Sequence, residues 1–303
     1  MSKKNIILLV LLFFFCIFIG LFFYAQNVYS DVTTTLQEIH EPELRKVSVL
    51  RKEEIVLQKK IPFSLLILGV DKREGDKGRS DTILFLTVNP TSESIKMVSI
   101  PRDTYTEIIG KEIQDKINHA YAFGGIEMSV NTVENLLNVP IDYVIQIDME
   151  GFKDIVDFIG GVTVNNDRSF QVNDTIFKEG EISLHGDQAL DYVQMRKDDP
   201  QGDFGRQLRQ KQVIQSLLKK GANFNILLKH NELLHIIEEN IQTNMTFEQM
   251  LNIQKEYKKS INTIESLSFE DGVGELKNGI WYYMMNEDEL NDISREMNEH
   301  LKM

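Results

Sequence analysis

The run IILLVLLFFFCIFIGLFFYA, residues 6–25, contains twenty consecutive residues without a charge. As an α-helix it would extend over about 30 Å, which matches the hydrocarbon core of a bilayer. Lys3 and Lys4 precede the run, and the first charge after it is Asp31. The positive-inside rule therefore predicts a cytoplasmic tail of residues 1–5 and a transmembrane anchor, with the rest of the chain outside the cell.

A cleaved signal peptide is the alternative, with Val28-Tyr29-Ser30 as a possible small-residue cleavage site. The apolar core of a signal peptide is about 7 to 15 residues long, and this run is longer. The length favours an uncleaved signal-anchor in a single-pass protein of the cell membrane.

Composition excludes two further classes of site. The single cysteine, Cys16, lies inside the apolar run, so the chain has no internal disulfide and no cysteine-based zinc site. The formal net charge of −13 argues against nucleic-acid binding, which needs a basic face.

The rest of the chain divides into three parts by composition. Residues 26–60 are polar and charged, and they predict an extracytoplasmic stalk. Residues 61–221 carry the apolar runs of a globular domain. Residues 222–303 are polar and helical in pattern, interrupted by one predicted strand in GVGELKNGIWYYM, and we expect them to pack on the same domain.

Strand and helix patterns alternate through the domain. The run FSLLILGV, residues 63–70, is almost continuously apolar, which is typical of a strand buried on both faces of a sheet that helices cover. Further strands are predicted over 82–88, 95–100, 142–148 and 162–166, and helices over 128–138, 151–161, 186–195 and 204–218. The predicted fold class is α/β, with a central mixed sheet flanked by helices.

The turn cluster NPTSES separates two strands and predicts their pairing. If residues 82–88 and 95–100 pair about the centre of that turn, Asp81 lies opposite Arg102. Asp71 closes the preceding strand, and a loop rich in basic residues returns through Arg79 to Asp81. We therefore expect four charged residues at one end of the sheet, where α/β proteins place ligands.

Each residue also has a structural explanation. Asp71 is acceptable as a turn cap, and Asp81 with Arg102 as a surface ion pair of little energetic value. Together, two carboxylates flanked by arginines suit Mg²⁺ (or Mn²⁺) with phosphate oxygens. The motifs HExxH, CxxC, GxSxG and GxxxxGK[ST] are absent from the sequence, which argues against zinc hydrolases, α/β-hydrolases and P-loop enzymes.

The stretch RKDDPQGDFGRQLRQKQV, residues 196–213, concentrates basic residues around a turn. Asp203 is a good helix N-cap. Arg206 and Gln210 would share the helix face that continues into Val213, Ile214 and Leu217, so they point inward at the positive end of the helix, where anions bind. The remaining basic residues, Lys197, Arg209 and Lys211, are expected on the surface.

Two histidines draw attention. His119 in KINHAYAFGG has no visible acid–base partner, which favours a structural hydrogen bond. His185 precedes a short helix and is expected in its cap region.

Five segments in order resemble the LytR–CpsA–Psr family of cell-wall enzymes: LLILGVD, GRSDTILFLTVNP, MVSIPRDT, DKINHAYAFGG and MRKDDPQGDFGRQLRQKQVI. The resemblance extends from about Phe63 to Gly221 and more weakly to the end. It is greatest to the teichoic acid transferases of Bacillus-like bacteria.

The resemblance implies a reaction. Family members transfer an anionic glycopolymer from a polyprenyl diphosphate carrier to a muramic-acid hydroxyl of peptidoglycan, at the membrane. The similarity to teichoic acid transferases implies wall teichoic acid as the polymer. It implies Mg²⁺ at Asp71 and Asp81, and an apolar pocket for the lipid. The diphosphate ligands that it implies are Arg79, Arg102, Arg196, Arg206 and Gln210. Many relatives have Arg-x-Arg before the turn, whereas this chain has Gln194 in the first position.

Charge then suggests a mechanism. Mg²⁺ and arginines stabilise the negative charge that grows on the leaving phosphate. Asp71 is the first candidate for the base that deprotonates the hydroxyl, and Asp103 is the second. Two alternatives stay open: a membrane-anchored sensor of the polymer without chemistry, and a hydrolase of the same lipid diphosphate.

Overall fold

The computed structural model describes residues 48–51, 55–71, 78–196, 199–221, 235–236 and 238–303. The expected cytoplasmic tail, the apolar run 6–25, the first part of the stalk and Lys197 lie outside these ranges. Among the described residues, no helix combines the length and the apolar character needed to cross a membrane.

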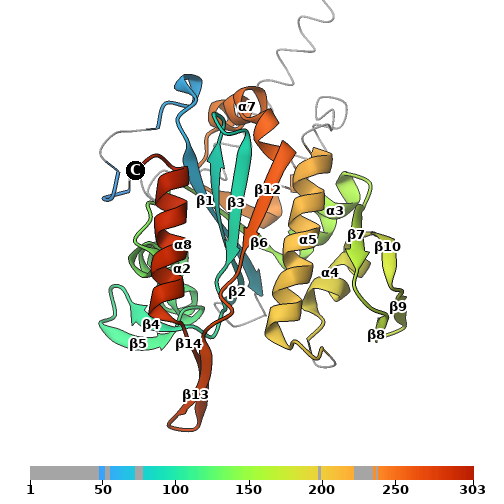
Figure 1. Cartoon of the computed structure of the whole chain (residues 1–303). Helices are drawn as coiled ribbons and strands as arrows, with labels where there is room; N and C mark the ends of the chain where they lie inside the picture. Colours follow the sequence, from blue (N-terminus) through green and yellow to red (C-terminus); the bar gives the residue numbers. More distant parts are fainter. Residues whose placement is uncertain (1–47, 52–54, 72–77, 197–198, 222–234, 237) are drawn as a thin grey trace, which may run out of the picture.

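A six-stranded mixed sheet forms the centre of the molecule (Figure 1), in the order β11–β6–β1–β2–β3–β12. Strand β6 runs parallel to β1 and β12 parallel to β3, and the other neighbours are antiparallel. The bounds are β1 Phe63–Asp71, β2 Arg79–Asn89, β3 Ser94–Ser99, β6 Tyr143–Asp148, β11 Ile241–Thr243 and β12 Thr263–Leu267. The predicted mixed α/β class is confirmed.

The β2–β3 hairpin has the predicted register. Leu84 lies opposite Ser99 and Val88 opposite Ile95, with Asn89 and Ser94 closing the pairing at the turn. The side-chain period of two then sends alternate residues of each strand to opposite faces.

Helices cover both faces of the sheet (Figure 1). Helices α2 (His119–Leu137) and α8 (Glu287–His300) pack on the face that carries Leu66, Leu68 and Val70 of β1. The other face, with Phe63, meets α5 (Asp203–Gly221) and α7 (Phe247–Glu256). The arrangement is the expected three-layer one.

A smaller layer lies beside α5. It comprises α3 (Met149–Phe158), α4 (Gly186–Gln194) and the antiparallel pair β7 (Val162–Asn166) and β10 (Gly180–Leu184), which share a separate apolar core. Helix α3 ends before Gly160 and Gly161, whose φ angles of 77° and 82° suit glycine. A short hairpin of β8 (Phe170–Val172) and β9 (Thr175–Phe177) extends this layer.

Two further hairpins flank the end of the sheet at which β1 terminates. They are β4 (Tyr105–Ile108) with β5 (Ile113–Lys116), and β13 (Val273–Lys277) with β14 (Ile280–Met284). The segment GVGELKNGIWYYM was predicted as one strand and forms a two-stranded hairpin turned at Asn278 and Gly279, which both have positive φ.

The prediction for residues 222–303 was incomplete in a second respect. Strands β11 and β12 from this region complete both edges of the central sheet. Edge strands bury little surface, and β12 has three exposed and two half-buried residues and no fully buried one. The sequence TIESL therefore lacks the apolar run that marks the central strands.

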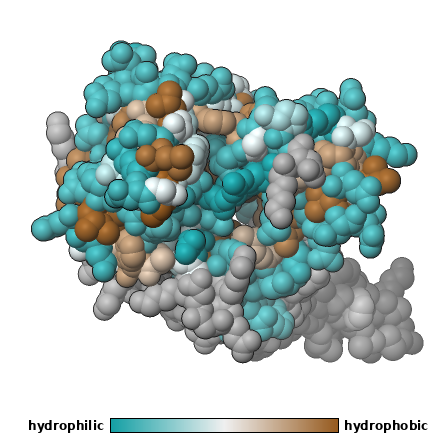
Figure 2. All heavy atoms as spheres, turned by 90° about the horizontal axis from the view of Figure 1, so that it is seen from below, coloured by the Kyte–Doolittle hydropathy of each residue, from teal (hydrophilic) through white to brown (hydrophobic). Residues whose placement is uncertain are grey.

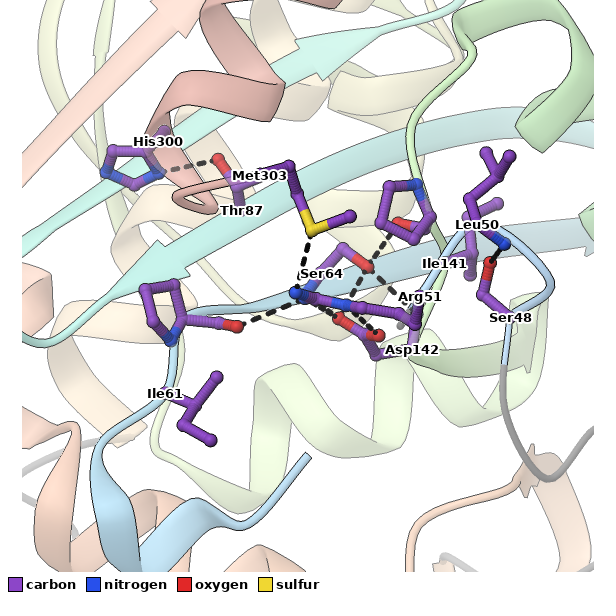
Figure 3. A network of polar contacts seen from close by, with 12 residues as sticks. Ser48, Leu50, Arg51, Ile61, Ser64, Thr87, Ile141, Asp142, His300 and Met303 are labelled. Carbon is purple, nitrogen blue, oxygen red and sulfur yellow. Dashed lines mark hydrogen bonds and ion pairs between the residues drawn. The ribbon is translucent and has the colours of Figure 1, made fainter. Parts of the chain in front are cut away.

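The last part of the expected stalk packs on the domain, opposite the end at which β1 terminates (Figure 3). Arg51 forms a buried ion pair of 2.6 Å with Asp142, which also accepts a hydrogen bond of 2.8 Å from the Ser64 backbone N–H. Leu57 is buried in the core under β1. These contacts lie N-terminal to the expected domain boundary at Ile61, so that boundary falls inside a packed segment.

Candidate functional site

The ends of β1, β2 and β3 bring four predicted residues to one edge of the sheet. Asp71, the last residue of β1, lies opposite Arg79, the first residue of β2. Two residues further along β2, the Asp81 Oδ2 atom pairs with Arg102 Nη1 at 2.9 Å. The predicted Asp81–Arg102 contact is confirmed, because the hairpin register extends past the end of β3.

A large cavity of about 1100 Å³ opens beside this edge, between the sheet and helices α3, α4 and α5. Its walls include Ile67, Phe152, Leu190 and Ile214, which are apolar. Ile67 and Gly69 are only half-buried because they border this cavity. The prediction that β1 is buried on both faces was therefore wrong for this part of the strand. Six of the predicted site residues lie on the cavity's polar part: Asp71, Asp81, Arg102, Arg196, Arg206 and Gln210.

A smaller cavity of about 310 Å³ adjoins the first. Asp81, Arg102 and Arg196 line both cavities, and Arg79 and Asp103 line the smaller one. Seen from this end, the molecule is hollowed near the middle of the face, with hydrophilic atoms along the hollow (Figure 2). All eight predicted site residues therefore border one or both of two adjacent cavities.

Arg206 lies in the first turn of α5 and is 6% exposed. It pairs with Asp203 at 2.8 Å, and its Nη2 donates to the Asp81 carbonyl at 3.4 Å. Its Nε atom is buried and has no hydrogen-bond partner within the described ranges. Burial and the nearby charges of Arg102 and Arg196 lower the pKa of Arg206. An anion bound beside it would favour the charged guanidinium and so counter both causes.

Arg102 shows the opposite shift. Burial alone would lower its pKa, but the charges of Asp81, Asp203 and Asp103 outweigh this effect and raise the pKa. Arg79 and Arg196 form no ion pair with any residue that the structure describes, and both are exposed. These two guanidinium groups are available for phosphate oxygens, which Arg binds with paired donors.

Asp103 is held by two cations. The Lys116 Nζ atom approaches its Oδ1 at 2.6 Å, and the Arg102 Nε atom lies 3.7 Å from Oδ2. Lys116, which ends β5, was not among the predicted site residues. Asp103 and Lys116 are thirteen residues apart and meet only in the folded chain, so sequence spacing carried no signal for this ion pair.

His119 does have an acid partner. Its Nδ1 atom lies 2.8 Å from Asp115 Oδ2, and the ring borders the smaller cavity. Burial alone would raise the pKa of Asp115, but hydrogen bonds, first from His119, lower it. The expected structural hydrogen bond of His119 is therefore present. Its acid partner, Asp115, lies four residues earlier in the sequence and was overlooked there.

The donor set at this edge suits a magnesium ion. Asp71 and Asp81 line the same cavity, and carboxylates are the ligands that Mg²⁺ prefers. In the described part of the chain, no three His, Cys, Asp or Glu side chains group closely enough to hold a metal. Two carboxylates are sufficient for an ion that completes its shell with water and phosphate oxygens.

Two basic residues of the stretch 196–213 were expected on the surface but are buried. Arg209 is 3% exposed and forms an ion pair of 2.7 Å with Asp199, whose side chain is fully buried. Lys211 is 4% exposed and donates to the Leu267 carbonyl at 2.6 Å. Burial lowers the pKa of Lys211 to about 8. Both side chains therefore bind α5 to neighbouring segments and are not part of its solvent-exposed surface.

The remaining local predictions are confirmed with small shifts. His185 is the N-cap residue of α4, and its backbone N–H donates to Gln188 Oε1 at 3.3 Å. Asp203 is the first residue of α5 rather than its N-cap, and it pairs with Arg206. Gln194 ends α4, lines the large cavity and contacts the Met149 sulfur at 3.5 Å.

Comparison with known proteins identifies the class. The sequence model of the LytR_cpsA_psr family matches residues 23–299, and the chain belongs to this family. It is 48% identical over 301 residues to a polyisoprenyl-teichoic acid–peptidoglycan teichoic acid transferase, TagU, of Bacillus mycoides (strain KBAB4), covering 99% of each chain.

Solved structures agree with this assignment. The crystal structure of B. subtilis TagU is 47% identical, with a TM-score of 0.66 over 80% of this chain and 98% of that one. A structure described as TagT bound to LIIa-WTA is 28% identical, with a TM-score of 0.73 over 85% and 97% of the two chains.

Proposed function

We propose that this chain is a transferase that moves an anionic glycopolymer, wall teichoic acid, from a polyprenyl diphosphate carrier to a muramic-acid hydroxyl of peptidoglycan. The observation that carries the proposal is the joining of an apolar cavity to a cluster of arginines at one edge of the sheet. A lipid tail with a diphosphate head has this division of chemistry. The relative from Bacillus mycoides, which is similar over 99% of each chain, bears the name of such a transferase.

The donor would lie across both parts of the large cavity. Its lipid chain packs against apolar side chains such as Phe152 and Leu190. Its diphosphate meets Arg102, Arg196, Arg206 and Gln210 at the cavity mouth, with Arg79 beyond it. The buried, unpartnered Nε of Arg206 is a donor that the diphosphate would satisfy.

Transfer then requires one bond to form and one to break. The acceptor hydroxyl oxygen attacks the phosphorus that bears the glycopolymer, and the bond from that phosphorus to the bridging oxygen breaks. Polyprenyl monophosphate leaves, and a phosphodiester joins the polymer to peptidoglycan. Arg102 and Arg206 would face the charge that accumulates on the leaving phosphate, and such fixed cations lower the barrier.

Asp71 and Asp81 would hold Mg²⁺, which neutralises phosphate charge when it is bound. The proton of the acceptor hydroxyl goes to a carboxylate, with Asp71 as the first candidate and Asp103 as the second. Asp103 is paired with Lys116 and Arg102, which makes it the weaker candidate. We also propose that residues 6–25 anchor the protein in the cell membrane, with the catalytic domain on the outer side.

The test uses the full-length chain in detergent micelles with a lipid-diphosphate-linked glycan and peptidoglycan oligomers. Mass spectrometry follows the products with Mg²⁺ or with EDTA. We expect a phosphodiester-linked glycan–peptidoglycan product that EDTA abolishes and that Asp81→Ala does not form. Glycan phosphate released equally without peptidoglycan would instead identify a hydrolase. Binding without any product in either metal condition would identify a sensor.

A further inference from the structure

The smaller cavity adjoins the proposed donor site but differs from it in chemistry. It shares Asp81, Arg102 and Arg196 with the large cavity, and its other lining residues are mainly polar. A transferase needs a second binding site from which the acceptor hydroxyl reaches the phosphorus. A polar cavity of about 310 Å³ that meets the arginine cluster has the position and the size for part of such an acceptor.

Trp281 borders this smaller cavity. It is the only tryptophan of the chain, and 45% of its surface is exposed. A sugar ring has one face of C–H bonds, and an exposed aromatic ring buries that face well. An exposed tryptophan beside a polar cavity therefore has the character of a sugar-binding platform.

The indole is held in a defined place. An added Cβ at Gly274 would lie 2.6 Å from Trp281 Nε1, so the ring rests directly on the backbone of β13. Strand β14 is tied to the turn after β3 by the Tyr283 backbone N–H, which donates to the Asp103 carbonyl at 2.9 Å. The Tyr282 hydroxyl donates to Asp115 at 3.4 Å. Trp281 is thus fixed relative to Arg102 and Asp103.

Polar groups with unused hydrogen-bonding capacity lie in the same cavity wall. Asn118 is 4% exposed; its Nδ2 donates to Asp81 at 3.2 Å, and its buried Oδ1 has no donor among the residues described. Asp115 engages Nδ1 of His119, and the other ring nitrogen has no partner within the same ranges. Amino sugars offer hydroxyl and acetamido groups that satisfy both kinds of atom.

We propose that the smaller cavity is the acceptor subsite, in which Trp281 stacks on an N-acetylated amino sugar of the peptidoglycan glycan strand while Asn118 and His119 bind its polar groups. This inference rests on the proposed transferase function. It adds the location of the acceptor and a residue that determines its affinity.

The first experiment uses Trp281 as a built-in fluorophore. The full-length protein in detergent is titrated with a metal-free muropeptide tetrasaccharide of alternating N-acetylglucosamine and N-acetylmuramic acid. We expect a saturable change in tryptophan emission. Maltotetraose, which lacks acetamido groups, serves as the matched control and should leave the emission unchanged.

The second experiment separates the two substrates kinetically. Trp281→Ala should raise KM for the acceptor about tenfold, which corresponds to the loss of one good aromatic contact. KM for the lipid diphosphate donor should stay the same. Trp281→Phe should restore most of the acceptor affinity, and Val273→Ala, an exposed apolar residue of the same hairpin, should have no effect.

The outcomes distinguish this inference from the proposed function. Two results together would overturn the subsite and leave the transferase intact: tryptophan emission of the unmutated protein that does not change with the tetrasaccharide, and an acceptor KM that is the same in Trp281→Ala. If Trp281→Ala raised KM equally for both substrates and lowered the melting temperature, the residue would have a structural role, and the subsite would also be overturned. A saturable emission change without any transfer would support the subsite and contradict the transferase.

Discussion

Arginine and lysine in the stretch 196–213 have two distinct roles that depend on where each side chain lies. Arg196 and Arg206 border the cavities, whereas Arg209 neutralises the buried Asp199. Burial alone would raise the pKa of Asp199, but hydrogen bonds from Arg209 and Arg168 lower it. A cluster of arginines in sequence is therefore not one anion site, because one of its three arginines, Arg209, holds the turn that shapes the site.

Arg102 is the residue whose loss should reduce catalysis most clearly. Arg102→Ala removes a cation that faces both cavities, and we expect kcat to fall by about 10²-fold, as for other transition-state donors. The control is Arg295→Ala, which removes an exposed arginine paired with Asp292. The transfer assay measures both variants, and an unchanged kcat for Arg102→Ala would exclude the assigned role.

His300 predicts a dependence of stability on pH. Its ring lies 2.7 Å from Thr87 Oγ1 and 2.9 Å from Ser94 Oγ (Figure 3 shows the contact with Thr87). Burial, with a smaller contribution from Lys96, lowers the pKa of His300 from 6.5 to about 4. The unfolded chain therefore binds more protons between these values, and stability falls as the pH drops from 6.5 to 4.

The full shift corresponds to about 3 kcal/mol. Urea unfolding across this pH range measures the effect, with His300→Gln as the comparison because glutamine does not titrate. The slope of the unfolding free energy with pH should be shallower in the variant. Parallel curves for the two proteins would contradict the assignment.

Helix α5 shows how packing overrides local propensity at the scale of an element. Its first two turns present Arg206 and Gln210 to the cavity, and its middle packs Val213 into the second core. Gly205 lies in that first turn although glycine is a poor helix former. An added Cβ would lie 2.0 Å from the buried Asp199 side chain, which explains the glycine.

Gly205→Ala should therefore destabilise the protein by about 2 kcal/mol or more, despite the better helix propensity of alanine. Gly221→Ala is the matched control at the other end of α5, where an added Cβ meets nothing within 4 Å among the residues that the structure describes. That variant should be neutral or slightly more stable. Thermal unfolding of both proteins gives the comparison, and a stabilised Gly205→Ala would show that Asp199 moves freely.

At the scale of the whole molecule, the two ends of the sheet have different tasks. One end carries both cavities, and the opposite end joins the N-terminal segment to the domain (Figure 3). Arg51 and Asp142 have side chains only 6% and 4% exposed there. Breaking a buried pair from one side costs about 3 to 5 kcal/mol, because a buried charge is left without its partner.

A chain that starts at Ile61 loses Arg51 and the buried Leu57. We expect it to be less stable by several kcal/mol than a chain that starts at residue 46. Arg51→Ala in the longer chain should reproduce part of the loss, and urea unfolding measures all three. Equal stabilities would show that residues 48–60 contribute nothing to the fold.

Local sequence patterns predicted the alternation of strands and helices, the β2–β3 register and six of the eight residues that line the cavities. Those six are Asp71, Arg79, Asp81, Arg102, Arg206 and Gln210, and they follow from local period, turn chemistry and pairing between chain neighbours, which a sequence records directly. Arg196 came from the family resemblance, and Asp103 from the mechanism considered with it. Tertiary contacts set the burial of Arg209 and Lys211, the edge position of β12, and the place of Trp281 and Asn118 beside the arginines. Those outcomes depend on contacts between segments far apart in the chain, where burial and pairing across elements outweigh local composition.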